Sequence, residues 1–324
     1  MATARAGWRI DPFTIAIAIT VGVASLLPCR GRGAEAFALI TDLAIGLLFF
    51  LHGARLAPET VLAGVKHWRL HLLVLTCTFV MFPLLGLLLT PLSSRLLSAE
   101  LQAGFLFLCA VPSTVQSSIA FTALARGNVA GAVCSASASS LMGVALTPAL
   151  VELLGLRAGA SLPFRDVVLN LLLQLFVPFL AGQLSRRWLK GWLAAHAGSL
   201  RVVDQGSILL AVYTAFSAAM VQGLWRKLSP VALLALLGLV GLLLGCALFS
   251  SWRASKLFGF SRADAIVIMF CGSKKSLVSG VPFANVLFPA ASVGAVVLPL
   301  MLYHQVQLMV CAAIAQRFAA TSDD

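Results

Sequence analysis

The chain has 324 residues, of which 60% are hydrophobic and only 10% are charged, and its formal net charge is +12. Soluble domains carry roughly 25% charged residues, so this composition excludes a soluble protein with an ordinary polar surface. Such a positive charge would suggest nucleic acid as a partner of a soluble protein. Here the basic residues lie mainly in short gaps between apolar runs, so we expect no nucleic-acid partner.

The apolar runs predict ten transmembrane helices, because a helix of about 20 apolar residues spans the hydrocarbon layer. Segments 57–67 and 189–201 place basic and aromatic residues among apolar ones and predict short helices at the membrane surface. The chain is thus expected to be an all-α integral membrane protein. The expected spans, numbered in chain order, are 12–28, 34–53, 68–91, 100–124, 128–154, 163–187, 203–224, 229–252, 261–287 and 290–317.

The distribution of Lys and Arg predicts the orientation in the membrane. The side with both termini and the even-numbered gaps carries 14 of these residues, and the opposite side carries 7. Cytoplasmic loops are enriched in basic residues, so we expect a multi-pass plasma (inner) membrane protein with both termini in the cytoplasm. The seven cysteines show no metal-ligand or disulfide spacing, and neither a metal nor a cofactor is expected.

A weak internal repeat relates the two halves of the chain. A shift of 162 residues places Cys109 on Cys271 and brings Thr114 and Ser117 onto serines. A second half displaced by five spans starts on the opposite side of the membrane, so the repeats 1–158 and 159–324 would be inverted, as in many secondary transporters. Chance similarity between apolar segments is the alternative.

Two of the expected spans are interrupted near their centres. In span four, Pro112 removes a backbone donor and is followed by a run of hydroxyl residues. In span nine, Gly272 and Ser273 precede Lys274 and Lys275. A charge at this depth costs at least about 2.5–3.5 kcal/mol, so each lysine needs a cavity, a carboxylate, or the open end of a broken helix. A loop over 272–276 between two half-spans is the alternative.

Several segments resemble the bile acid:sodium symporter family. They are Pro112-Ser-Thr, Ala125-Arg-Gly-Asn-Val-Ala130 and Phe82-Pro-Leu-Leu85. Phe49-Phe-Leu-His-Gly53 and Phe270-Cys-Gly-Ser-Lys-Lys-Ser-Leu277 are similar to the branch that contains the vertebrate solute carrier family 10 member 7. The resemblance implies two inverted five-helix repeats. It also implies a panel of spans 1, 2, 6 and 7 beside a core of spans 3, 4, 5, 8, 9 and 10. Spans four and nine would cross where they unwind, with substrate beside the crossing.

The sequence departs from this family at its ion sites. Typical members bind two sodium ions through a Glu in span nine and polar residues in spans three, four and five. No Asp or Glu occurs between Ala265 and Ser322, and Thr78 stands about where the family carries Gln. We therefore expect the pair of sodium sites to be absent and a lysine ammonium to occupy the place of an ion. A lysine that loses its proton in each cycle would permit proton coupling, whereas one that stays charged would favour an anionic substrate.

These observations predict a secondary active transporter of a small organic solute, with an anion favoured, that works by alternating access. The alternative is a non-transporting membrane regulator or a channel-like protein on the same fold, and no enzyme is indicated. The expected partners are a small-molecule substrate, membrane lipid, and either sodium or a proton as coupling ion. The candidate binding residues are Pro112, Ser113, Thr114, Gln116, Ser117, Ser118, Ser135, Ser139, Thr78, Gly272, Ser273, Lys274, Lys275, Ser276 and Asp42.

Ser135 and Ser139 also fit close helix packing, and Asp42 also fits a position at the membrane interface. Asp204 and Gln205 are interpreted as the N-terminal cap of span seven, and His304 as a hydrogen-bonded core residue rather than a proton relay.

Overall fold

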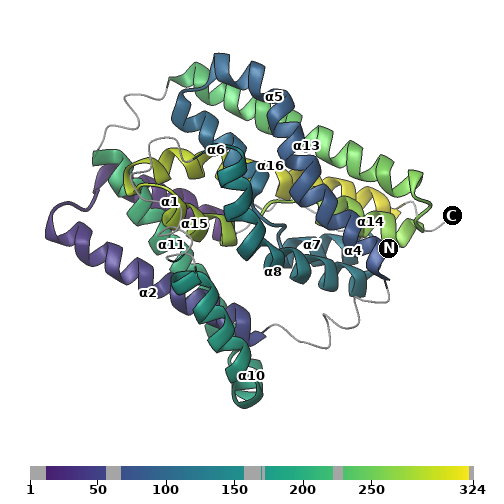
Figure 1. Ribbon diagram of the computed structural model, residues 1–324, viewed down its shortest axis with the longest axis horizontal. Helices are drawn as coiled ribbons and strands as arrows, with labels where there is room; N and C mark the ends of the chain where they lie inside the picture. The colour runs from purple at the N-terminus through teal and green to yellow at the C-terminus, as the bar shows by residue number, and fades with distance from the viewer. Residues whose placement is uncertain (1–11, 56–66, 157–168, 170–171, 222–228, 321–324) are drawn as a thin grey trace, which may run out of the picture.

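Helices form all of the regular structure in residues 12–55, 67–156, 169, 172–221 and 229–320, which the computed structural model describes (Figure 1). The first half contains α1 (Pro12–Leu26), α2 (Arg32–Arg55), α4 (Trp68–Thr76), the π-helix η2 (Cys77–Met81), α5 (Phe82–Leu96), α6 (Ala99–Ala110), α7 (Gln116–Leu124) and α8 (Val129–Leu153). The second half contains the π-helix η3 (Leu172–Phe176), α10 (Val177–Ala195), α11 (Ala197–Val221), α13 (Pro230–Leu257), α14 (Arg262–Gly272), α15 (Leu277–Leu287) and α16 (Ala290–Ala320).

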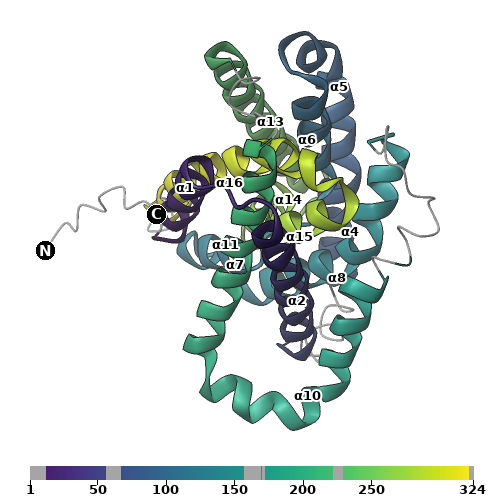
Figure 2. The same ribbon diagram turned by 90° about the vertical axis from the view of Figure 1, so that its left-hand side faces the viewer.

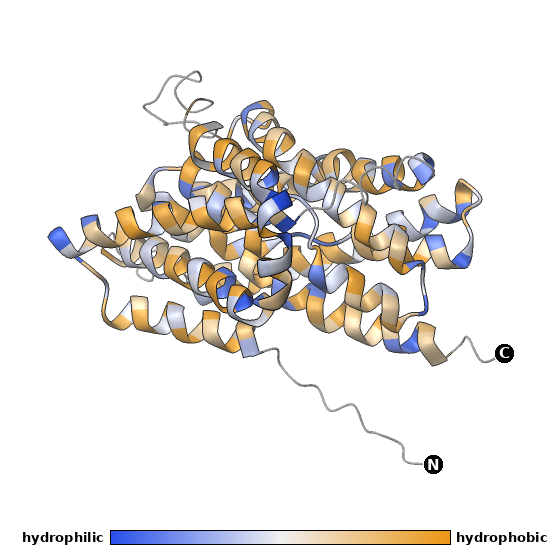
Figure 3. Ribbon diagram, turned by 90° about the horizontal axis from the view of Figure 1, so that it is seen from below, coloured by the Kyte–Doolittle hydropathy of each residue, from blue (hydrophilic) through white to orange (hydrophobic). Residues whose placement is uncertain are grey.

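Within the described residues, seven helical segments are long and apolar enough to cross a membrane. Two shorter apolar helices, Ile15–Leu26 and Ala99–Ala110, accompany them. Large aliphatic side chains such as Leu88 and Leu234 are exposed on the outer faces, as lipid contact requires. Figure 3 shows apolar residues along most of the helices and hydrophilic residues concentrated towards their ends. This is an all-helical integral membrane architecture.

The bounds of most expected spans lie close to those of the helices, and both interruptions are present. Helix α6 ends at Ala110 before α7 starts at Gln116, and α14 ends at Gly272 before α15 starts at Leu277. The π-helix η2 joins α4 to α5, so the third span extends from Trp68 to Leu96.

Two expectations for the segment around residues 189–204 were wrong. No separate surface helix covers 189–201, because α10 continues to Ala195 and α11 starts at Ala197. Asp204 therefore lies in the second turn of α11 and not at its start, so it is no N-terminal cap. The other expected surface helix falls on residues 57–66, outside the described part of the chain, as does most of 163–171.

The helices pack in two groups. In the first group α1 packs against α11, and α2 packs against both α10 and α11 (Figure 2). The second group contains α4 to α8 and α13 to α16. Helix α11 joins the groups by packing against α15 and α16, and Phe49 of α2 contacts Phe283 of α15 with ring centroids 5.9 Å apart.

Two glycines allow α2 and α10 to touch backbone to backbone. A Cβ atom at Gly53 would lie 2.0 Å from the carbonyl oxygen of Phe179, and one at Gly182 would lie 1.9 Å from that of Phe50. Neither position can hold a larger residue unless the helices separate, which matches the role of small residues at membrane helix interfaces.

Candidate functional site

The site begins with two broken helices. Helix α6 ends because Pro112 cannot donate a backbone hydrogen bond, and residues 111–115 leave the helical path. In the second break, Ser273 bonds back to Met269 and Ser276 starts α15 by accepting a hydrogen bond from the Ser279 N–H at 3.1 Å. Each break exposes backbone groups that need partners in a buried setting.

The two breaks supply these partners to each other. The Ser276 N–H donates to the carbonyl oxygen of Pro112 at 2.9 Å, and the Ser113 hydroxyl donates to the carbonyl oxygen of Cys271 at 2.6 Å. The Ser118 hydroxyl lies 3.4 Å from the carbonyl oxygen of Phe270. Spans four and nine therefore meet at their interruptions, and the contact is buried.

Helix α8 supports the first break from the side. The Ser113 N–H donates to the Ser139 hydroxyl at 3.0 Å, and the Thr147 hydroxyl donates to the carbonyl oxygen of Ala110 at 3.0 Å. A Cβ atom at Gly143 would lie 2.7 Å from Pro112 Cβ, so this glycine allows the close approach. Ser139 thus belongs to the crossing through a hydrogen bond to its backbone.

Lys275 extends from the second break into the first. Its Nζ donates to three carbonyl oxygens, those of Thr78 at 2.8 Å, Cys109 at 2.9 Å and Val111 at 2.8 Å. The Lys275 side chain is fully buried, and Nζ lies 4.2 Å from the centre of the Phe82 ring. An ammonium group has three N–H donors, so three carbonyl acceptors match it completely. The charge also lies at the carbonyl end of α6, which favours a cation.

The carbonyl of Thr78 is available because of the π-helix. The Phe82 N–H bonds to Cys77 five residues back and so bypasses Thr78. Residue 83 is a proline and has no N–H to offer. The carbonyl of Thr78 therefore lacks a helical donor and accepts from Lys275 instead. Thr78 contributes its backbone to the site, while its hydroxyl bonds to Val74.

Two residues of α16 hold the second break. The side-chain amide of Gln307 accepts from the Lys275 N–H and donates to the Lys275 carbonyl oxygen, both at 2.9 Å. The Tyr303 hydroxyl donates to the carbonyl oxygen of Ser273 at 2.6 Å. His304 bonds to Gln307 at 2.9 Å, as expected for a hydrogen-bonded core histidine. Gln307 and Tyr303 are not among the site residues that the sequence predicts.

Lys274 points to the start of α7. Its Nζ donates to the carbonyl oxygen of Ser117 at 2.8 Å and lies 3.7 Å from the centre of the Phe121 ring, a cation–π contact. Next to it, the Thr114 hydroxyl bonds to those of Ser117 at 2.8 Å and Ser118 at 3.0 Å. Within the described residues, both lysine ammonium groups are therefore held by carbonyl oxygens and aromatic rings and not by carboxylates.

Three candidates lie apart from this cluster of hydrogen bonds. Ser135 bonds to His71 of α4 at 2.7 Å, so it links α8 to α4. Asp42 is exposed on α2, a helix that packs with α10 and α11 and not in the group that contains the two breaks. Gln116 is exposed at the first turn of α7 and lines a separate pocket.

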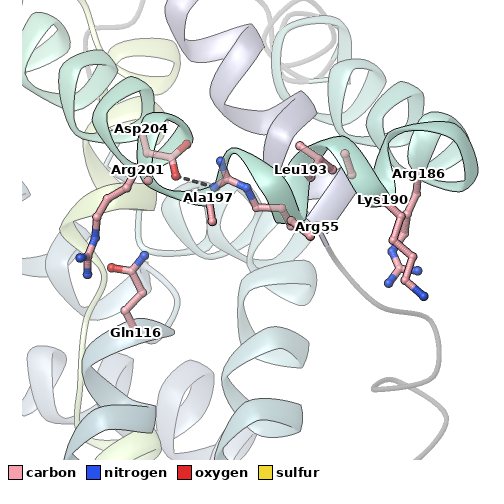
Figure 4. Close-up of a pocket in the computed structure, with 11 residues that line it drawn as sticks. Arg55, Gln116, Arg186, Lys190, Leu193, Ala197, Arg201 and Asp204 are labelled. Carbon is pink, nitrogen blue, oxygen red and sulfur yellow. Dashed lines mark hydrogen bonds and ion pairs between the residues drawn. The ribbon is translucent and has the colours of Figure 1, made fainter.

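That pocket has a volume of about 590 Å³ and lies between α2, α10, α11 and the start of α7 (Figure 4). Arg55, Arg186, Lys190 and Arg201 line it, and the Asp204 carboxylate pairs with Arg55. In the sequence these basic residues indicate only the orientation in the membrane. Their shared pocket had no local sequence signal, because they come from three different helices.

The sequence matches the SBF-like CPA transporter family over residues 11–320, which is nearly the whole chain. The chain belongs to this family. The resemblance to bile acid:sodium symporters in the broken spans is thereby confirmed, and the protein is a multi-pass integral membrane transporter and not an enzyme.

Proteins similar to this chain occur in bacteria and in vertebrates. The chain is 57% identical over 314 residues to "Uncharacterized protein PA2026" of Pseudomonas aeruginosa, covering 97% of this chain and 94% of the relative. It is 48% identical over 309 residues to "Putative symporter YfeH" of Escherichia coli, covering 95% and 93%. It is 29% identical over 310 residues to "Sodium/bile acid cotransporter 7" of the mouse, covering 93% and 90%. These similarities extend over both helix groups.

Proposed function

We propose that this transporter moves a small organic anion by alternating access and without sodium. The observation that carries the proposal is the crossing of two broken helices, where two buried lysines place positive charge and no carboxylate of the described chain bonds to either ammonium. Positive groups and open helix ends in a membrane interior are typical features of substrate and ion sites in secondary transporters.

The helix bounds support two inverted five-helix repeats, 1–158 and 159–324. A shift of 162 residues moves α6 from 99–110 to 261–272, against 262–272 for α14. The same shift moves the segment 68–96 to 230–258, against 230–257 for α13, and α8 from 129–153 to 291–315, against 290–320 for α16. Ten spans related in this way would form one site from two equivalent breaks.

The two helix groups support a panel and a core. We assign α1, α2, α10 and α11 to the panel and the other helices to the core, which holds both breaks. Alternating access would then be a movement of these groups about the contact of α11 with α15 and α16. The backbone contact between α2 and α10 at Gly53 and Gly182 would keep the panel rigid as it moves.

Lys275 supports sodium independence. Sodium needs several oxygen ligands, and here three carbonyl oxygens already bind an ammonium group at 2.8–2.9 Å. We infer that Lys275 takes the place of a bound cation and stabilises the crossing permanently. The names of the relatives include a putative symporter and a sodium/bile acid cotransporter, which supports an ion gradient as the energy source for transport. Lys274, held by one carbonyl oxygen and two aromatic rings, is then the candidate carrier of a coupling proton.

The proposed orientation places both termini in the cytoplasm of the plasma (inner) membrane, and the pocket lined by Arg55 and Arg201 on that same side. Fusions of a cytoplasmic and an extracytoplasmic reporter to the C-terminus test this directly. Activity of the extracytoplasmic reporter alone would overturn the orientation.

Counterflow in proteoliposomes tests the function. Several organic anions are tested one at a time. Vesicles loaded with one unlabelled anion are diluted into a solution of the same anion in labelled form, with sodium, with choline, or with an imposed pH gradient. We expect accumulation of label for at least one anion, equal in sodium and choline. Strict sodium dependence would overturn the role of Lys275. Absence of flux for every solute, with folded protein in the vesicles, would favour a regulator over a transporter.

A further inference from the structure

The pocket between α2, α10 and α11 is separate from the crossing and strongly basic. Arg55 ends α2, Arg186 and Lys190 lie one turn apart on α10, and Arg201 lies near the start of α11. In Figure 4 the Arg201 side chain lies near Gln116 at one side, Arg186 and Lys190 lie at the other, and Arg55 lies between them. With Asp204 as the one acidic residue of the described lining, four positive charges and one negative charge give a formal charge of +3.

The ion pair in the pocket leaves polar atoms without partners. Arg55 bonds Asp204 through Nη1, while Arg55 Nη2 and Asp204 Oδ1 are buried and lack a hydrogen-bond partner within the described part of the chain. Buried polar groups in folded proteins are nearly always satisfied. Nη2 is buried, so an anionic group would accept from it once the Arg55–Asp204 pair opens, and guanidinium groups bind carboxylate, phosphate and sulfate oxygens with good geometry.

The start of α7 adds a second feature that favours anions. Helix α7 begins at Gln116 on the pocket wall, and its N-cap, Val115, provides no side-chain hydrogen bond to the first N–H groups. A helix N-terminus carries a partial positive charge and attracts anions. Helix α7 is also the second half of broken span four, so one helix links the wall of the pocket to the crossing.

Resting on the proposed function, we propose that this pocket binds the transported solute and that the solute carries at least two negative charges on carboxylate, phosphate or sulfate groups. A dianion or trianion offers these basic side chains more charge and more acceptor oxygens than a monoanion does, which fits the formal charge of +3 of the described lining. The volume of about 590 Å³ suits a small organic molecule. Anionic lipid headgroups share this chemistry, but the link to the crossing through Gln116 favours a soluble solute.

Citrate and inorganic phosphate are suitable probes, with acetate as the monoanion, all at equal ionic strength. Binding is measured as thermal stabilisation of the whole protein in phosphatidylcholine nanodiscs. We expect citrate to bind at least tenfold more tightly than acetate. Arg186→Gln, Lys190→Gln and Arg201→Gln should each weaken citrate binding about tenfold. Arg187→Gln is the matched control. It removes the same charge from the same helix, but Arg187 stacks on Trp188 and does not line the pocket.

Three outcomes would overturn the proposal. The first is equal affinity for citrate and acetate, and the second is an equal loss of citrate affinity in Arg186→Gln and Arg187→Gln. The third is the loss of thermal stabilisation by citrate when phosphatidylglycerol is present, which would identify a lipid site. Melting temperatures without ligand distinguish misfolded variants from variants that lack binding. Counterflow separates the two proposals. Citrate binding without any flux would overturn the transport function and leave an anion-binding pocket that carries no transported solute, whereas anion flux with no citrate preference would overturn the assignment of the pocket.

Discussion

Ser113 and Lys275 make the same contact from opposite sides of the crossing. The Ser113 hydroxyl donates to the carbonyl oxygen of Cys271 at 2.6 Å, and Lys275 Nζ donates to the carbonyl oxygen of Cys109 at 2.9 Å. The shift of 162 residues that the sequence suggests relates the two pairs to each other, because it places Ser113 on Lys275 and Cys109 on Cys271. One position, however, holds a neutral hydroxyl and the other a charged ammonium with two additional carbonyl partners. The equivalent contacts therefore differ in charge, and the crossing depends more on Lys275.

Replacing Lys275 should destabilise the protein strongly. Lys275→Met keeps most of the side-chain volume but leaves three buried carbonyl groups without a donor, each at a cost of about 1–3 kcal/mol. We expect a fall of several degrees in the melting temperature of the purified protein. Lys256→Met is the control, since Lys256 is exposed at the end of α13. Equal melting temperatures for the two variants would contradict the importance of the carbonyl contacts.

A smaller replacement should create a sodium site. Lys275→Ala leaves the carbonyl oxygens of Thr78, Cys109 and Val111 around an empty volume, and hard cations prefer oxygen ligands. We expect sodium chloride to raise the melting temperature of Lys275→Ala more than choline chloride does. The wild-type protein should respond equally to both salts. Sodium-specific stabilisation of the wild type would contradict the view that Lys275 replaces an ion.

The sequence was sufficient to predict the breaks because their causes are local. Pro112 cannot continue a helix, and Gly272 and Ser273 with two lysines are unfavourable inside an apolar span. The carbonyl oxygens that accept from Lys275 could not be predicted from local sequence. The carbonyl of Thr78 is available only because η2 shifts the hydrogen bonds by one residue before Pro83, and its approach to Lys275 depends on tertiary packing.

The basic pocket could not be predicted for a related reason. Arg55, Arg186 and Arg201 each lie in or beside a charged gap between apolar runs, which is the normal pattern of residues that set orientation. Only the packing of α2 between α10 and α11 brings them together. Asp204 was wrongly assigned as a cap because the apolar run starts after it, whereas the helix already starts at Ala197.

The contact between α2 and α10 should tolerate no side chain at its glycines. Gly53→Ala places a Cβ atom 2.0 Å from a backbone oxygen that no rotamer change can move. We expect a clear loss of folded protein in the membrane, measured by fluorescence-detected size-exclusion chromatography. Gly238→Ala is the control, because nothing lies within 4 Å of a Cβ atom there. Similar yields of both variants would show that α2 and α10 can separate at little cost.

The Arg55–Asp204 pair should set the affinity of the basic pocket. Asp204→Asn removes the one acidic group of the described lining and releases the Arg55 guanidinium from its ion pair, so citrate should bind several-fold more tightly. Arg55→Gln should have the opposite effect. The gain in citrate affinity of Asp204→Asn should decrease as salt is added, because salt screens electrostatic attraction. Glu35→Gln removes the same charge from the first turn of α2, at the end opposite Arg55, and should leave citrate binding unchanged. If Asp204→Asn weakened citrate binding while the protein stayed folded, the carboxylate would hold Arg55 in its binding position and would not compete for it.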